Sequence, residues 1–486
     1  MSLCWLHFPS YDLARKGLAG SFLNITTPEI IDSLQRAAVK ESRLGIPILF
    51  GLDVIHGYST IFSIPLAHAS TWDPDLVKTC AAVAGKEAAS QGIRWTFSPM
   101  VGIARDPRWG RIAEGAGEDP YLGSKMAWAY VEGYQGAKLL PSSNLVACAE
   151  HYVAYGGAEG GRDYNTAEVS RRTLWEIYLP SFKAAVEVGV GTVMSAFDDL
   201  DGVPASANKY TITGILKDDW NFTGFVVSDW DAIGELMNHG IASDSAEAAE
   251  KAVKAGVDMD MVGPYHGTLA KLAESGKVPI DIVNDAVKRI LRIKFELGLF
   301  DHPYVDILKS RESLMLPEYR KVALEEERQA IVLLRNEGGV LPFSKQVESI
   351  AVIGPLTDSK PDMLGRWYCL GQADSVVTLL DGIRLMLPKA TILVAKGCGI
   401  TDTSTAGFAD AIDAAARADI VVSAVGESGN MTGEAESRAS LKMPGVQDRL
   451  VRKIVKLGKP TVEVLMNGRP LSIQWDADHV PAILET

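Results

Sequence analysis

Short apolar runs alternate with amphipathic helical segments along the chain, and this alternation limits the possible folds more than any other feature. After each run comes a loop rich in Gly, Asp, His or Pro, and then apolar residues at helical spacing. Strand and helix alternating in this way predict a parallel sheet with crossover helices. The runs lie at residues 20–24, 46–53, 94–100, 145–153, 191–197, 224–229 and 256–261.

The number of repeats and their extent favour a (β/α)8 TIM-type barrel over an open sheet. No GxGxxG follows the first run, as a dinucleotide-binding sheet would require. Seven strands are identified, and the eighth is either missing or lies before residue 20. A helix over residues 281–300 closes the unit, so we predict an α/β barrel spanning residues 1–300.

A second α/β domain is predicted over residues 321–486, after a polar, proline-punctuated linker at 301–320. A helical pattern over 318–343 leads to apolar runs at 347–355, 390–397, 416–426 and 459–473, which favour an open sheet. The last run, VPAILET, has no later segment to cover or pair it. We therefore expect this domain to be truncated at Thr486, and the chain begins as abruptly.

The composition excludes several classes of partner. A formal charge of −13, with 47% hydrophobic and 22% charged residues, predicts a globular protein whose acidic surface repels nucleic acid and anionic membrane. No stretch of about eighteen apolar residues occurs, and the start lacks a signal-peptide pattern, so we expect a soluble, unexported chain. The ligand expected is neutral or cationic. Five scattered cysteines without a CxxC predict buried thiols.

Polar residues gather after the predicted barrel strands, at the end where such a barrel places its chemistry. The stretch GFVVSDWDAI presents Asp229 after a buried apolar run. Taken alone, Asp229 or Ser228 could simply cap the next helix. Because at least four strand ends carry such residues, a shared pocket is favoured. The others are Asp53, His56, Arg105, Asp106, Arg108, Arg111, Glu150, His151, Arg162, Asp163 and Trp230.

These residue types fit a sugar pocket better than a metal or phosphate site. The aspartates and histidines lack HxH or HExxH spacing, and EGGRDYN is a weak anion-binding loop. Carboxylates and arginines hydrogen-bond sugar hydroxyls, and exposed aromatic rings stack on a pyranose. We expect Trp109, Tyr155 and Trp230 to be exposed for this purpose. The expected partner is a small carbohydrate, with no metal and no cofactor.

Glycoside hydrolysis needs two carboxyl groups, and Asp229 is the first candidate. The second lies in the loop after the apolar run at 416–426, which carries Glu427, Glu434 and Glu436. A solvated acidic loop would have the same composition. A loop of this length at a strand end can equally reach across a domain interface.

Six motifs occur in the order found in glycoside hydrolase family 3, and the chain most resembles its bacterial periplasmic β-glucosidase type. They are GLDVIHG, ARDPRWGR, HYVAYGGAEGGRDYN, GFVVSDWDAI, AIVLLRNEGGVLPF and VLMNGRPL. The resemblance covers essentially the whole chain. It implies a (β/α)8 barrel followed by an α/β sandwich domain, with the active site between them. Related proteins are often periplasmic or secreted, and their second domain continues further, often into a fibronectin-type domain.

The resemblance also implies a role for each site residue. Asp229 is the nucleophile, and Glu434 in GEAESR is the acid/base, ahead of Glu436 and Glu427. The implied reaction is that of a retaining exo-β-glycosidase, a β-glucosidase acting on short oligosaccharides or aryl glucosides. The alternatives are a β-xylosidase-type specificity and a sugar-binding protein without turnover. The implied sugar contacts are Asp53, Arg111, His151, Arg162 and Trp230, and we also expect Glu150 to be a substrate-binding residue.

Two residues depart from the family pattern. Glu150 stands where a lysine usually precedes the pocket histidine, which replaces a cationic donor with an acceptor and disfavours ionised Asp229. Ser59 stands where related sequences often carry a basic residue. The family's β-N-acetylglucosaminidases carry a KHFPGHGD-like motif where this chain has HYVAYGG, which disfavours that activity.

Overall fold

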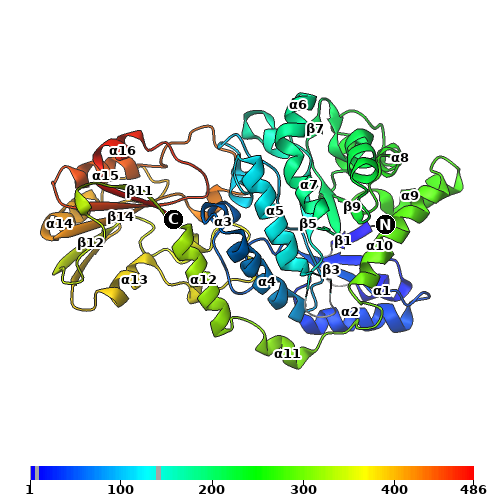
Figure 1. Ribbon diagram of the computed structural model, residues 1–486, viewed down its shortest axis with the longest axis horizontal. Coiled ribbons are helices and arrows are strands. Elements are labelled where there is room, and N and C mark those ends of the chain that lie inside the picture. The colour runs from blue at the N-terminus through cyan, green and yellow to red at the C-terminus, as the bar shows by residue number, and fades with distance from the viewer. Residues whose placement is uncertain (1, 6–9, 138, 140–143) are drawn as a thin grey trace.

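The computed structural model describes residues 2–5, 10–137, 139 and 144–486, which form two units side by side along the long axis of Figure 1. The first unit is the barrel, coloured blue to green. The second unit is a six-stranded sheet with its helices, coloured yellow to red.

All strand pairs around the barrel are parallel. One sheet runs in the order β10-β1-β2-β3-β4 and the other in the order β5-β6-β9. Parallel bridges from Trp95 to Val146 and from Val227 to Met259 join the two sheets and close the barrel. The strands are β1 (Ser2–Trp5), β2 (Ser21–Leu23), β3 (Leu49–Leu52), β4 (Trp95–Thr96), β5 (Cys148–Tyr152), β6 (Thr192–Ser195), β9 (Phe225–Ser228) and β10 (Asp260–Met261).

The barrel fold and its seven predicted strands are thereby confirmed. The eighth strand, left open by the sequence, is β1, which lies before residue 20 and between β10 and β2. A short antiparallel hairpin of β7 (Asp199–Leu200) and β8 (Val203–Pro204) follows β6 and stands outside the barrel sheet.

Helices surround the barrel strands, and their ends follow ordinary capping chemistry. Asp73 caps α4 by accepting a hydrogen bond from the Leu76 N–H at 3.1 Å. A π-helix at Tyr210–Asp219 occupies the crossover between β6 and β9. The α-helices are α1 (Tyr11–Lys16), α2 (Pro28–Glu41), α3 (Pro65–Ser70), α4 (Pro74–Ser90), α5 (Pro120–Gln135), α6 (Arg171–Thr173), α7 (Pro180–Glu187), α8 (Ser245–Ala255), α9 (Tyr265–Glu274) and α10 (Ile280–Glu296).

Two layers of apolar side chains hold the barrel. Its interior is filled by Trp95, Phe97, Met194 and Phe225, with the ring centroids of Trp95 and Phe225 5.3 Å apart. A larger cluster fills the space between the strands and the surrounding helices. Because the interior is packed, a ligand can enter only at an end of the barrel.

The second unit is an open, mostly parallel sheet in the order β11-β16-β15-β14-β12-β13, with helices on its faces (Figure 1). Only the β11–β16 pair is antiparallel. The elements are β11 (Val332–Asn336), β12 (Ser349–Ile353), α13 (Leu379–Met386), β13 (Thr391–Ala395), α14 (Phe408–Arg417), β14 (Ile420–Gly426), α15 (Gln447–Val455), β15 (Thr461–Met466), α16 (Gln474–His479) and β16 (Ala482–Glu485).

One detail of this unit corrects the sequence interpretation. The predicted helix through residues 318–343 ends at Ala330, and the β-branched and leucine residues after it form strand β11. VPAILET has no later segment to pair with, and its strand β16 pairs with the earlier strands β15 and β11.

The segment predicted as a linker contains helix α11 (Ile307–Glu312) and the start of α12 (Pro317–Ala330). Helix α12 packs against α3 and α4 of the barrel and then continues into β11. The division into residues 1–300, 301–320 and 321–486 therefore remains a proposal. Most of α12 falls within 321–486 in that division, although the helix packs against the barrel.

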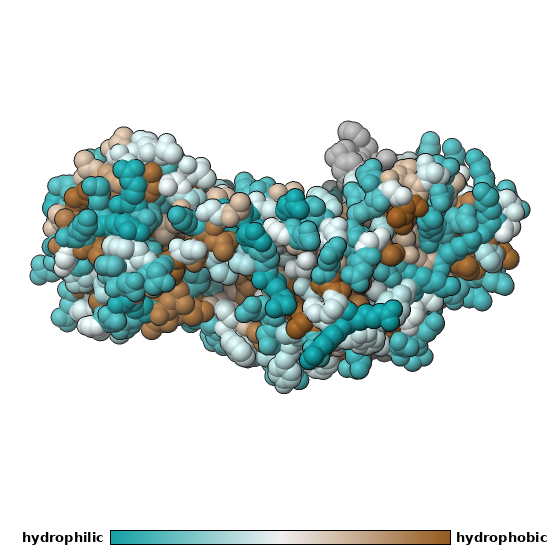
Figure 2. All heavy atoms as spheres, turned by 90° about the horizontal axis from the view of Figure 1, so that it is seen from above, coloured by the Kyte–Doolittle hydropathy of each residue, from teal (hydrophilic) through white to brown (hydrophobic). Residues whose placement is uncertain are grey.

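The surface is largely hydrophilic, and Figure 2 shows hydrophobic residues only in scattered groups on the face in view. No helix in the described ranges is long and apolar enough to cross a membrane. Of the cysteines whose side chains are described, Cys80, Cys148 and Cys398 are buried, Cys369 is partly buried, and all four are free thiols. This agrees with the expectation of buried thiols.

Candidate active site

Asp229 lies directly after β9, at the end of the barrel that faces the second unit. Its Oδ1 accepts a 2.7 Å hydrogen bond from the Trp230 N–H, which fixes the carboxyl group. Its Oδ2 is buried and has no hydrogen-bond partner among the described residues. No α-helix begins here: the predicted helical stretch is a turn and a 3-10 segment, and α8 starts only at Ser245. Asp229 is therefore not a helix cap, and one oxygen remains available to a ligand.

The loop after β14 carries Glu434 from the second unit to the barrel. The Gly433 N–H donates to Gly110 O at 2.8 Å, and the Ala435 N–H donates to Asp163 Oδ2 at 2.6 Å. A Cβ on Gly110 would lie 2.2 Å from Gly433 O, so this close approach requires glycine there. Tyr164 donates to Glu434 Oε1 at 2.5 Å. Backbone and side-chain contacts thus hold Glu434 beside the barrel.

The other two glutamates of this loop have different surroundings. Glu427 is buried and forms ion pairs with Arg438 and, at 3.2 Å, with Arg469. The Glu436 carbonyl accepts a 2.7 Å hydrogen bond from Arg469. Both glutamates therefore help to build the loop, whereas the carboxyl group of Glu434 is bound by Tyr164 of the barrel.

Arg111 is the cation of the site, and two of its nitrogens are already bound to Glu114. Its Nε and Nη2 donate to the Glu114 carboxylate at 3.1 and 2.9 Å, and both side chains are buried. Its charge lowers the pKa of Asp53, Glu150 and Asp229, opposing the effect of burial. The structure thus brings these three carboxyls around one paired guanidinium.

Burial dominates the electrostatics of this cluster. It raises the pKa of Asp229 from 3.8 to about 8, and repulsion from Glu434 and Asp53 adds to the rise. Burial raises the pKa of Asp53 to about 7, with Glu114 and Glu434 adding to it. Since such shifts cluster at functional sites, they mark this end of the barrel as the candidate active site.

Glu150 and His151 occupy the end of β5, next to the nucleophile candidate. His151 Nε2 lies 3.3 Å from Asp229 Oδ2 and 3.6 Å from Glu150 Oε2. Burial, together with Arg111, lowers the pKa of His151 well below 6.5, so the ring is neutral. Burial raises the pKa of Glu150 well above 4.5, and repulsion from Asp229 and Asp53 increases the shift.

The aromatic residues only partly match their predicted exposure. Trp230 is 38% exposed, as expected. Trp109 and Tyr155 are only 1% exposed, which corrects the prediction. Trp109 donates to Asp163 Oδ1 at 2.6 Å and its ring packs against Tyr155, so both rings support the loops instead of stacking on a ligand.

Three other predicted positions fall outside the buried cluster. Arg162 is exposed, and its Nε donates to Glu159 O at 3.3 Å. Ser59 is buried, and its N–H donates to Glu87 Oε2 at 2.9 Å, which makes it part of the scaffold. His56 is also buried, with its ring nitrogens near Phe62 O and Arg366 O.

Two contributions were missed by the sequence reasoning. Tyr164 lies in the quoted GGRDYN motif, but nothing in the motif reveals that its hydroxyl meets a loop 270 residues away. A loop from the second unit also reaches the barrel, since the Leu370 N–H donates to Tyr58 O at 2.8 Å. The sequence feature that could have revealed this loop is its GRWYC stretch, residues 365–369, which combines a glycine with two aromatic residues.

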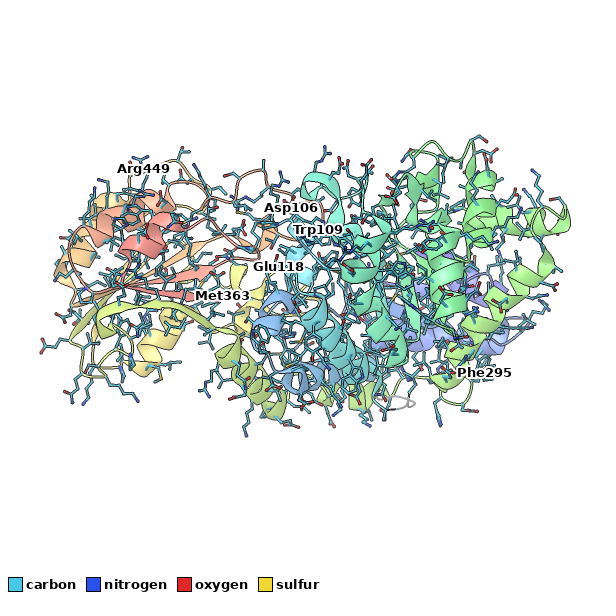
Figure 3. All side chains as sticks on the ribbon, turned by 45° about the horizontal axis from the view of Figure 1, so that its top comes forward. Asp106, Trp109, Glu118, Phe295, Met363 and Arg449 are labelled. Carbon is cyan, nitrogen blue, oxygen red and sulfur yellow. The ribbon has the colours of Figure 1, made fainter. Side chains whose placement is uncertain are left out.

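Figure 3 shows where the barrel loop that carries Trp109 lies in the molecule. Asp106, Trp109 and Glu118 lie at the junction of the two units, and Phe295 lies far from it at the other end of the barrel. No group of three or more His, Cys, Asp and Glu side chains in the described ranges is arranged to hold a metal ion.

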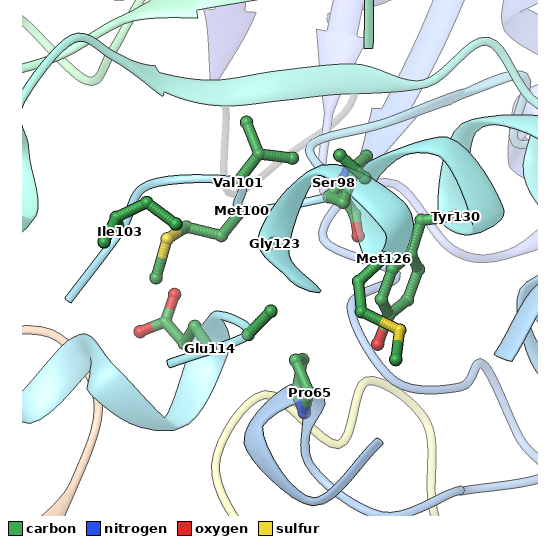
Figure 4. A pocket seen from close by; sticks show the side chains of 12 residues that line it. Pro65, Ser98, Met100, Val101, Ile103, Glu114, Gly123, Met126 and Tyr130 are labelled. Carbon is green, nitrogen blue, oxygen red and sulfur yellow. The ribbon is translucent and has the colours of Figure 1, made fainter. Parts of the chain in front are cut away.

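Two cavities lie outside the cluster. One of about 10 Å³, behind Glu114 and lined by Met100, Met126 and Tyr130 among others, has room for about one water (Figure 4). The other, of about 780 Å³, lies between α1, α2, α9 and α10 near Gly20, where β2 begins. That is the amino-terminal end of the barrel, where conserved features of this fold serve stability and not catalysis.

Residues 14–293 match the N-terminal domain of glycosyl hydrolase family 3, and residues 331–486 match its C-terminal domain. The periplasmic beta-glucosidase of Salmonella typhimurium is 39% identical over 98% of this chain and 66% of its own length. A beta-xylosidase of Formosa agariphila is 37% identical over 97% of this chain and 69% of its own length.

Among solved structures, a beta-glucosidase from Listeria innocua in complex with isofagomine superposes with a TM-score of 0.94 at 38% identity. The match covers 100% of this chain and 68% of that one. The same beta-glucosidase has been solved with glucose, and a mutant of it with laminaribiose. This chain thus spans about two thirds of the length of these relatives.

Proposed function

The chain belongs to glycosyl hydrolase family 3, and from this premise we propose that it is a retaining exo-β-glycosidase of the β-glucosidase type. Its substrate would be a short oligosaccharide or an aryl glucoside, from which it releases the terminal sugar. Relatives named beta-glucosidase and beta-xylosidase match it at similar identity, so a β-xylosidase-type specificity is the second candidate.

One observation carries the proposal: Asp229 Oδ2 is buried without a hydrogen-bond partner in the described structure, and Glu434 of the second unit lies close enough to raise the pKa of Asp229. The two residues come from different units, and repulsion from Glu434 contributes to the raised pKa of Asp229. Retaining glycoside hydrolysis requires two carboxyl groups, one as the nucleophile and one as the acid/base.

The reaction then has two steps. Asp229 attacks the anomeric carbon while Glu434 gives its proton to the departing oxygen, so the glycosidic bond breaks and a glycosyl ester forms. Glu434 next removes a proton from water, and the resulting hydroxide attacks the same carbon and frees Asp229. Two inversions retain the configuration, and neither step needs a metal ion.

The other side chains would act on the sugar around this pair. Asp53 and Arg111 lie within the cluster and would hold hydroxyl groups, and the exposed ring of Trp230 would line the pocket at its rim. His151 presents a neutral ring whose Nδ1 has no partner among the described residues. Arg162 would contribute only from the outer edge, because its side chain is exposed.

Covalent trapping tests the proposal. Incubation with an activated 2-fluoro glucoside should add one glycosyl group, and peptide mass spectrometry should place it on Asp229. The 2-fluoro xyloside should label more slowly if glucose is preferred. Absence of any adduct, together with measurable glucose binding, would instead favour a sugar-binding protein without turnover.

A further inference from the structure

The pocket carries more acidic groups than its cation can neutralise. Among the described residues, no Lys or Arg nitrogen lies within ion-pair distance of Asp53, Glu150 or Asp229. Arg111 acts on all three from a distance, but its guanidinium is bound to Glu114 through two nitrogens. His151, the remaining basic residue of the cluster, is neutral.

Buried polar atoms in this cluster also lack partners. Asp229 is 7% exposed and its Oδ2 makes no hydrogen bond in the described structure; His151 is 2% exposed and its Nδ1 makes none. Glu150, whose Oε2 lies 3.6 Å from His151 Nε2, is 2% exposed. Such groups are costly to bury unless a ligand completes them, and a cationic donor would complete carboxylates best.

We propose that the sugar held in this pocket bears an ammonium group, and that Glu150 is the residue that recognises it. The ligand class is an amino sugar in which a free amine replaces one hydroxyl group. This inference rests on the proposed sugar-binding function and names the class of sugar that the site selects.

The chemistry of the cluster favours a cation over a hydroxyl group. A neutral hydroxyl needs one acceptor and does not favour ionisation of these carboxyls, whose pKa values burial raises. An ammonium group donates to several carboxyl oxygens at once and favours their ionised form. It would also lower the pKa of Asp229, which must ionise before it can act as a nucleophile.

Calorimetry on the whole chain at about pH 6, where the amines are protonated, provides the test. The probes are the four glucose derivatives with an amine on carbon 2, 3, 4 or 6. Glucose is the hydroxyl reference, and N-acetylglucosamine is the neutral amide reference. At least one amine should bind about tenfold more tightly than glucose. Repeating the titration in buffers of different ionisation enthalpy should show proton release as the carboxyls ionise.

Glu150→Gln separates charge from hydrogen bonding, because the amide keeps the size and the polar atoms of the carboxyl. The variant should lose the preference for the amine and most of the proton release while still binding glucose. Glu118→Gln makes the same chemical change at an exposed glutamate and should bind the probes like the wild type.

Wild-type protein that binds glucose as tightly as every amine would overturn the inference, even if Glu150→Gln proved unstable. An unchanged amine preference in Glu150→Gln would also overturn it. These outcomes are distinct from failure of the proposed function, because calorimetry does not depend on turnover. If the 2-fluoro glucoside labels Asp229 but no amine is preferred, the proposed glycosidase function is supported and the amino-sugar inference is wrong. If an amine is preferred but Asp229 is not labelled, the chain is an amino-sugar-binding protein without turnover.

Discussion

The hydroxyl of Tyr164, on a barrel loop, donates a 2.5 Å hydrogen bond to Glu434 Oε1, on a loop of the second unit. This contact joins the two halves of the molecule at the carboxyl group proposed as acid/base. The bond also leaves Glu434 Oε2 as the oxygen available to protonate a leaving group. Tyr164 is therefore a positioning residue whose effect should depend on how much the leaving group needs a proton.

Tyr164→Phe should lower kcat by about tenfold for glucosides with poor leaving groups, since it removes the hydrogen bond that positions the proposed proton donor. Activated aryl glucosides, which need less protonation, should be affected much less. A merely structural role would reduce both equally. Tyr121→Phe, at an exposed tyrosine of α5, is the matched control and should behave like the wild type.

Asp229→Asn should leave the fold intact and reduce turnover of aryl β-glucosides by about 10³-fold or more, because the amide cannot form the glycosyl ester. Steady-state assays and circular dichroism would measure the two effects. Asp218→Asn, at an exposed position of the π-helix, should retain activity. Activity near that of the wild type in Asp229→Asn would refute the nucleophile assignment.

The same variant tests the raised pKa of Asp229. The folded-state pKa of about 8 exceeds the ordinary value of 3.8, so the folded protein keeps a proton that the unfolded chain loses. This contribution to stability is complete below about pH 4 and is lost as the pH rises to about 8. The Tm of Asp229→Asn minus that of the wild type should therefore increase across this window. A constant difference would contradict the shift.

Glu434→Ala should lose about 10²-fold or more in kcat for poor leaving groups, the usual contribution of general acid catalysis. Azide should restore turnover of activated substrates, because an external anion attacks the glycosyl ester without a general base. Glu436→Ala, in the same loop, should show neither the loss nor the rescue. If azide rescues Glu436→Ala instead, the acid/base is Glu436.

The sequence predicted those parts of the molecule that depend on local pattern. Asp229 could be placed because a buried apolar run ends directly before it, and the end of a parallel strand has a fixed position in a barrel. Strand β11 could not be separated from α12, since its leucines continue the helical apolar pattern and only pairing with β16 makes it a strand.

Side-chain exposure in the loops was less predictable. Trp109 and Tyr155 are buried because the loop of Glu434 packs over them through Asp163, a contact that spans the two units. Arg162 points outward because its guanidinium bonds back to Glu159 O within the same short loop. Both outcomes depend on tertiary contacts that no local pattern encodes.

Arg469 gives the last prediction, because it connects the stability of the interface with catalysis. It is 1% exposed, pairs with Glu427 at 3.2 Å and donates to Arg108 O at 2.9 Å across the interface. It also donates to Met431 O and Glu436 O, on either side of Glu434.

Arg469→Ala should therefore lower the free energy of unfolding by about 3 kcal/mol, because Glu427 keeps only Arg438 as its partner and three carbonyl groups lose a donor. Urea denaturation would measure this loss. Because the loop of Glu434 loses its anchor, kcat for poor leaving groups should also fall in the protein that remains folded. Arg449→Ala, at an exposed arginine of the second unit (Figure 3), should change neither quantity. Lost stability with unchanged kcat would show that Arg469 holds the interface without positioning Glu434.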